Sequence, residues 1–188
     1  VEETTRLAPA VRHEQLRGGL RGWDGQLIDD ARLVVAVART AAGYGASVLT
    51  RVEASEVHGD GALLRDLLTG DSIRVRARAV VGAAGVWAGE LDDDVSLRPS
   101  RGTHLVVVTD RLGGSDVSLT VPLAGSSSRF VFTLPSMHGR SYIGLTEVPA
   151  DGPLPDVPEA TESEITMLLD TVNQVLAEPI ARDEVLAT

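Results

Sequence analysis

The pattern of apolar and polar positions changes character along the chain. Residues Ala31–Ala42 are rich in alanine and valine, with apolar side chains at helical spacing, which predicts a helix. Asp29 is suited to cap its start, and the glycines that follow residue 42 are suited to end it. Residues Ser47–Val52 then have the pattern of a strand. A helix joined to a strand by a short glycine turn is half of a βαβ unit.

The next segment has the spacing of a small antiparallel sheet. Glycine-containing turns separate three short strand candidates, which are Ala54–His58, Ala62–Leu68 and Ser72–Ala77. The third alternates apolar residues with arginines, which predicts a strand buried on one face. Residues Ala79–Ala84 are all small or apolar and predict a strand covered on both faces, ending at Gly85.

Beyond Pro99 the pattern is mainly that of β-structure. Four further strands are predicted, at Thr103–Val108, Ser118–Val121, Phe130–Leu134 and Ser141–Leu145. A proline-rich loop over residues 149–158 leads to a capping box at Thr161–Glu164 and to an apolar helical pattern that Pro179 would end. Val185 is expected to begin another strand.

These patterns predict an α/β (α+β) fold in two domains. Residues 1–97 would form a partial Rossmann-like layer with a small β-meander. Residues 98–188 would form an antiparallel sheet with a covering helix.

Composition narrows the functional classes. The 188 residues are 43% hydrophobic, which is enough for a buried core. A net charge of −10 with dispersed arginines argues against nucleic-acid binding. There is no cysteine, the four histidines stand far apart, and the run Asp92–Asp94 is typical of a solvated loop, so no metal site is predicted. No apolar run approaches the roughly 20 residues that span a bilayer.

Two stretches could carry chemistry. The small residues of Gly82–Ala88 would let the backbone approach a ligand at the carboxyl end of a strand, where cofactors bind in doubly wound sheets. Two arginines and a histidine in Arg98–His104 suit an anionic substrate, because guanidinium matches phosphate geometry and histidine titrates near neutrality. Each also has a structural interpretation, as a tight strand exit and as an ordinary strand histidine. A third stretch, Trp23–Leu33, taken alone is a glycine turn and a helix cap.

In this order and spacing, the three stretches resemble the FAD-dependent glycerol-3-phosphate dehydrogenases of bacteria, especially those of actinobacteria. The resemblance covers essentially all 188 residues. It includes Gly19–Leu33, Ala83–Ala88, Arg98–His104, Phe130–Pro135, Gly144–Glu147 and Arg182–Thr188. The chain departs from the family where Gly-Leu-Thr-Glu at 144–147 replaces Gly-Thr-Thr-Asp, and where Gly-Ala-Ala-Gly at 82–85 replaces Asn-Ala-Thr-Gly.

The resemblance implies FAD as the cofactor and assigns roles to residues. His104 would be the base or proton relay beside the flavin, and Arg101 and Thr146 would lie at the substrate. The cofactor would meet two segments of backbone, one at the adenine end and one along the dinucleotide. These segments are Thr50, Arg51 and Val52, and then Ala83, Ala84 and Gly85 with Trp87 behind them. No residue is assigned to a metal.

The resemblance also implies a reaction for the intact enzyme. It would oxidise sn-glycerol 3-phosphate to dihydroxyacetone phosphate, with hydride moving from C2 to flavin N5 and electrons passing to a membrane quinone. Such an enzyme would be cytoplasmic and peripheral at the inner face of the cell membrane. The alternatives are a glycerol-phosphate oxidase or an amine-oxidising relative, both using oxygen, and a non-catalytic binding or interaction module.

The family's glycine-rich fingerprint does not occur in this sequence. We therefore expect the chain to be an internal fragment, inactive alone and without bound FAD. We also expect self-association through strand edges that the rest of the enzyme would cover, so that a homo-oligomer forms.

Overall fold

The computed structural model describes residues 1–135 and 138–188, which form two compact units. One unit joins Val1–Ile28 to Pro99–Thr188, and the other is Asp29–Arg98. The later boundary lies close to the predicted one at 97/98, but the first 28 residues belong with the later sheet and not with the segment that follows them. The first residues belong to this unit because their main chain pairs with the C-terminal part of the chain, where Val11 forms a β-bridge with Leu176.

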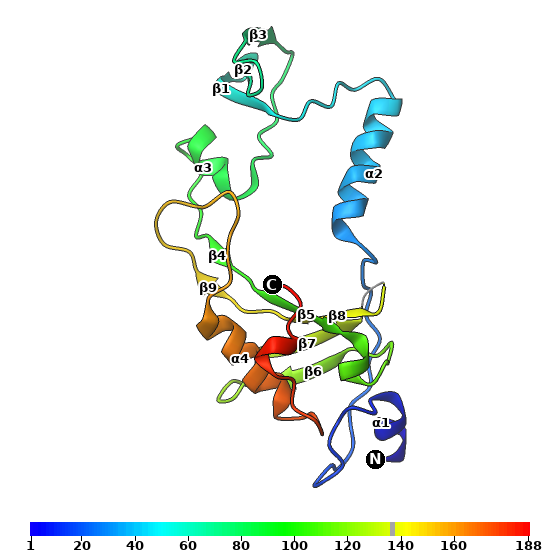
Figure 1. Cartoon of the computed structure of the whole chain (residues 1–188). Coiled ribbons are helices and arrows are strands. Elements are labelled where there is room, and N and C mark those ends of the chain that lie inside the picture. The colour runs from blue at the N-terminus through cyan, green and yellow to red at the C-terminus, as the bar shows by residue number, and fades with distance from the viewer. Residues whose placement is uncertain (136–137) are drawn as a thin grey trace. The chain divides into compact units, whose positions relative to one another are not determined.

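The first unit is built on a four-stranded antiparallel sheet in the order β5-β8-β7-β6 (Figure 1). Its strands are β5 (His104–Val108), β6 (Leu119–Pro122), β7 (Phe130–Pro135) and β8 (Arg140–Gly144). All four predicted strands are confirmed, and their ends agree to within one residue. The register pairs His104 on β5 and Phe132 on β7 with Gly144 on β8.

Helix α4 (Glu162–Asn173) packs on this sheet and encloses the hydrophobic core. The predicted capping box is present, with the side chains of Thr161 and Glu164 each bonded to the other's main chain. The core joins the inward residues of β5, β7 and β8 to the apolar face of the helix, namely Leu105, Val107, Val131, Ile143, Ile165, Leu168, Leu169 and Val172. The helix ends well before Pro179, because the Asn173 side chain binds both main-chain groups of Ile180 and folds the chain back.

Smaller elements complete the first unit. Helix α1 (Glu2–Leu7) lies in a region where the sequence predicted no element. Strand β4 (Ser100–Arg101) pairs with β9 (Val148–Pro149). The strand predicted from Val185 is reduced to one bridge, between Ala187 and Val106, after the 3-10 turn η3 (Arg182–Glu184).

The second unit contains helix α2 (Asp30–Gly43) and a three-stranded sheet. Its strands are β1 (Val52–His58), β2 (Gly61–Asp66) and β3 (Ser72–Arg76), paired in sequence order. The predicted helix, its cap and the three-stranded meander are confirmed, with Asp29 Oδ1 accepting a hydrogen bond of 2.8 Å from the Arg32 amide. The turn η1 (Gly85–Trp87) and helix α3 (Ala88–Leu91) close the unit.

Two strand predictions in this unit were wrong. Residues 47–51 and 79–84 contain no strand. Each was predicted as part of a parallel sheet, and such a strand exists only when a neighbour bonds to its main chain. The described residues supply neither segment with that neighbour.

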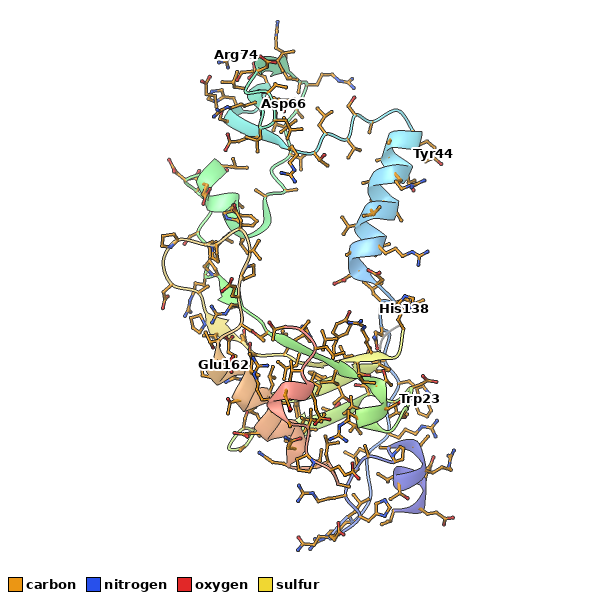
Figure 2. The ribbon with its side chains drawn as sticks, in the orientation of Figure 1. Trp23, Tyr44, Asp66, Arg74, His138 and Glu162 are labelled. Carbon is orange, nitrogen blue, oxygen red and sulfur yellow. The ribbon has the colours of Figure 1, made fainter. Side chains whose placement is uncertain are left out.

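No residue of the second unit is buried. Tyr44, at the end of α2, is exposed (Figure 2), and Ile73 on β3 is 64% exposed. The prediction that β3 is buried on one face was therefore wrong, because all five of its residues are exposed. Within the described residues, no helix is both long and apolar enough to cross a membrane, and no cluster of three potential metal ligands occurs.

Candidate functional site

The four-stranded sheet has one face under α4 and one open face. Because side chains alternate along a strand, the residues between the buried core positions point to the open face. This face carries His104 and Val106 on β5, Tyr142 and Gly144 on β8, and Phe132 on β7. A histidine and two aromatic rings thus share an exposed surface.

The His104 imidazole packs against Gly144 on this face, and we call this contact the seat of His104. A Cβ atom on Gly144 would lie 2.9 Å from both Cγ and Nε2 of His104, closer than real Cβ contacts come. The ring also meets the Tyr142 ring edge-on, with centroids 6.1 Å apart and an interplanar angle of 69°. The prediction that His104 lies on a strand of the larger sheet is confirmed. Its orientation toward the Ala83–Trp87 turn stays a prediction, since that turn belongs to the other unit.

On the inward side of the same strand ends lies a buried carboxylate, Glu164 of α4. It is 5% exposed and accepts hydrogen bonds from Arg101 Nη2 at 2.8 Å, Thr103 Oγ1 at 3.2 Å and Thr146 Oγ1 at 3.1 Å. Burial by itself raises the pKa of Glu164, but the hydrogen bonds outweigh it and lower that pKa from 4.5 to about 2. They come from the Thr161 main chain and side chain, and from Arg101 and Thr103. Glu164 is therefore ionised near neutral pH.

The structure brings two of the predicted substrate residues together around this carboxylate. Thr146 is 1% exposed, and its hydroxyl accepts a hydrogen bond of 2.8 Å from the Thr103 amide while it donates to Glu164. Arg101 forms an ion pair with Glu164. The contact of these two residues with substrate stays a prediction. In the structure both bind Glu164 and so join the strand ends to α4.

The sequence pattern identified Glu164 only as a capping residue. Its hydrogen bonds to Arg101, Thr103 and Thr146 were not predicted. The signal that could have indicated them is the threonine at position 103, because the alternation of β5 places that residue among inward-facing apolar ones. A buried polar residue needs a partner, and a helix that starts over the strand end can supply one.

The predicted cofactor residues lie in the second unit. Thr50 and Arg51 precede β1, Val52 begins it, and the Arg51 carbonyl accepts a hydrogen bond from the Leu67 amide at 2.9 Å. Ala83 and Ala84 lead into the turn η1, where Gly85 has φ of 57° and Trp87 is partly exposed.

The small-residue turn fits the close approach of a cofactor. A Cβ atom added at Gly82 or Gly85 would meet nothing within 4 Å, so the backbone there is open. Glycine adopts the positive φ at position 85 without the strain that a side chain would add. The segment therefore fits the wall of a dinucleotide site, and the individual contacts stay predictions.

Comparison with known proteins assigns the chain to a family. The family described as FAD dependent oxidoreductase matches residues 1–187. The chain belongs to this family. The match covers both units, so the open sheet face and the small-residue turn are parts of a flavoprotein fold.

Among curated relatives, the chain is 53% identical over 180 residues to glycerol-3-phosphate dehydrogenase 1 of Mycobacterium tuberculosis, covering 96% of the chain and 35% of the relative. It is 36% identical to glycerol-3-phosphate dehydrogenase 2 of the same organism, covering 96% of the chain and 32% of the relative. The chain thus spans about a third of the length of these relatives.

Two solved structures are also similar. The glycerol-3-phosphate dehydrogenase of Bacillus halodurans complexed with FAD matches with a TM-score of 0.82 and 27% identity, over 98% of this chain and 38% of that one. Glycine oxidase of Geobacillus kaustophilus matches with a TM-score of 0.54 and 25% identity, over 79% of this chain and 39% of that one. These matches confirm the predicted family resemblance and the mixed fold class.

Proposed function

We propose that this chain is the central part of a flavoenzyme that oxidises sn-glycerol 3-phosphate to dihydroxyacetone phosphate and passes the electrons to quinone. Support comes from the 53% identity to a mycobacterial glycerol-3-phosphate dehydrogenase and from the TM-score of 0.82 to a dehydrogenase complexed with FAD. The observation that carries the proposal is the contact of His104 with Gly144, which holds an exposed imidazole on the open face of the sheet.

The roles of this chain's residues follow from that geometry. FAD, when bound, supplies the acceptor for the C2 hydride. An imidazole nitrogen of His104 accepts the proton of the C2 hydroxyl as the carbonyl forms. The backbone of Ala83, Ala84 and Gly85 lies along the dinucleotide, and at Gly85 no neighbouring atom stands within 4 Å of where a Cβ would be.

Substitution of His104 by Ala in the intact enzyme tests the proposal. Turnover of glycerol 3-phosphate should fall by about two orders of magnitude, the usual scale for a lost general base. FAD content, measured from the flavin absorbance, should stay unchanged. The residues that contact the His104 ring, Gly144 and Tyr142, are not among the predicted cofactor residues. His13→Ala, at an exposed loop histidine, is the matched control and should leave turnover intact. Unchanged turnover in His104→Ala would refute the assignment.

A second candidate function is supported by the similarity to glycine oxidase, at a TM-score of 0.54. An amine-oxidising enzyme or a glycerol-phosphate oxidase would pass its electrons to oxygen. Turnover of glycerol 3-phosphate and of small amino acids, each with a quinone analogue or with oxygen as acceptor, separates these activities. We expect glycerol 3-phosphate with quinone to give the highest rate. An enzyme with no turnover of any of these substrates would favour a binding or interaction module.

Reduction of a membrane quinone also implies a location. We propose that the intact enzyme is cytoplasmic and peripheral at the inner face of the cell membrane, with a homo-oligomer as its assembly. Co-sedimentation with quinone-containing vesicles tests the membrane contact, and analytical ultracentrifugation tests the assembly.

A further inference from the structure

The Glu164 carboxylate stands out because all of its hydrogen-bond partners among the described residues are donors. Six hydrogen bonds reach its two oxygens, two from Arg101, two from Thr161, one from Thr103 and one from Thr146. An ionised carboxylate only accepts hydrogen bonds and therefore fits this site. A glutamine amide would place its own donor against one of these donors, although it has almost the same shape.

These partners connect Glu164 to the strand ends that carry His104. Thr103 directly precedes His104, and it is bonded to Thr146 in both directions. Its amide donates to the Thr146 hydroxyl at 2.8 Å, and its carbonyl accepts from the Thr146 amide at 3.3 Å. Thr103 is one residue from His104, and Thr146 is two residues from Gly144, the partner of His104 in the sheet. Glu164 binds both hydroxyls of the pair and so fixes the ends of β5 and β8 to the first turn of α4.

We propose that Glu164 is a positioning residue for His104. Thr103 points inward to Glu164 and His104 points outward, so a shift of the strand end on one face moves the imidazole on the other. We call the hydrogen bonds that join Glu164, Thr103 and Thr146 the clamp. The clamp keeps the imidazole on Gly144 and thereby fixes the direction of its nitrogens. Its consequence for turnover rests on the proposed function, whereas its effect on the position of the ring does not.

Glu164→Gln is the direct test, and Glu162→Gln is its matched control. Glu162 lies in the same helical turn (Figure 2), makes an exposed ion pair with Arg182, and is 75% exposed. In the 188-residue chain, the His104 ring signals in a ¹H–¹³C NMR spectrum should move in Glu164→Gln and stay in place in Glu162→Gln. Leu168→Ala, which weakens the core without touching the clamp, should also leave those signals in place.

In the intact enzyme, Glu164→Gln should lower kcat for glycerol 3-phosphate by roughly 10- to 100-fold, since small misplacements of a reacting group have effects of that size. kcat should change by more than KM does, because the clamp acts chiefly on His104 and so on the chemical step, and flavin content should not change. Unmoved His104 signals together with unchanged kcat would overturn the proposal.

A second pair of variants keeps the test valid if Glu164→Gln does not fold. Thr146→Val removes the hydroxyl that joins Glu164 to Thr103, and Thr146→Ser retains it. The His104 signals should move in the valine variant and keep their place in the serine variant. Equal spectra for the two would overturn the clamp. Moved signals in an enzyme that does not oxidise glycerol 3-phosphate would refute the proposed function and leave the positioning role standing.

Discussion

The Cα atom of Gly144 lies under the imidazole of His104, where any side chain would meet the ring. Gly144→Ala should therefore displace the imidazole and lower kcat in the intact enzyme, at a stability cost of about 1–3 kcal/mol from overpacking. His104 ring signals and turnover measure the two effects. The control is Gly59→Ala, where an added Cβ meets nothing within 4 Å. Normal turnover in Gly144→Ala would show that the seat does not set the ring's position.

The pH dependence of stability follows from Glu164. Its pKa is about 2 in the folded chain and ordinarily 4.5, so between these values the unfolded chain binds more protons. The stabilisation from ionised Glu164 is therefore fully present above about pH 4.5 and is lost as the pH falls toward 2. The difference in unfolding free energy between the native chain and Glu164→Gln, measured in urea, should shrink over this range. A difference that is constant with pH would contradict it.

At the scale of elements, α4 is the helix whose packing decides the stability of the sheet. Leu168 is completely buried between α4 and the sheet. Leu168→Ala should reduce the free energy of unfolding by about 2–5 kcal/mol, through lost apolar burial and the cavity left behind. Leu68→Ala, at a leucine that is 76% exposed, should change it by less than about 0.5 kcal/mol. Equal effects of the two in urea unfolding would mean that the core is placed wrongly.

The elements that the sequence predicted well are those stabilised by neighbours along the chain. The capping box at Thr161 and Glu164, the cap at Asp29 and the three-stranded meander each follow from residues a few positions apart. The strand predicted at 47–52 is absent apart from Val52, and the one predicted at 79–84 is absent altogether, because their hydrogen-bond partners would have to come from a different part of a parallel sheet.

At the scale of the whole molecule, the two units differ in how much they bury. The hydrophobic core lies in the unit of the four-stranded sheet, while α2 and β3 expose large apolar residues. We expect this exposed surface to drive self-association of the isolated chain at high concentration. Light scattering as a function of concentration measures it, and a monomer at all concentrations would contradict it.

The isolated chain should also bind no FAD. The pyrophosphate of a dinucleotide is held by a glycine-rich loop at a helix N-terminus, and this sequence has no such loop. The open turn at Ala83–Gly85 offers backbone contacts alone. After incubation with FAD and gel filtration, the chain should show no flavin absorbance, whereas the intact enzyme treated in the same way should be yellow. A stoichiometric flavin spectrum from the chain would mean that it contains a pyrophosphate site.

The sequence by itself determined most of the elements and the family, and it named a candidate base. The spacing of apolar residues specifies helices and hairpins because those structures satisfy their main-chain hydrogen bonds locally. The motifs around Ala83–Ala88 and Arg98–His104 indicated a flavoprotein, and the family match confirmed it. Only the tertiary structure decided what surrounds the candidate base.

Gly144 lies under His104, and Glu164 binds Arg101 and Thr146, although these residues are 18 to 63 positions apart. Such contacts depend on the register of β5 against β8 and on where α4 crosses their ends. Local propensity carries no information about either, because both are set by the packing of side chains from distant segments into one core.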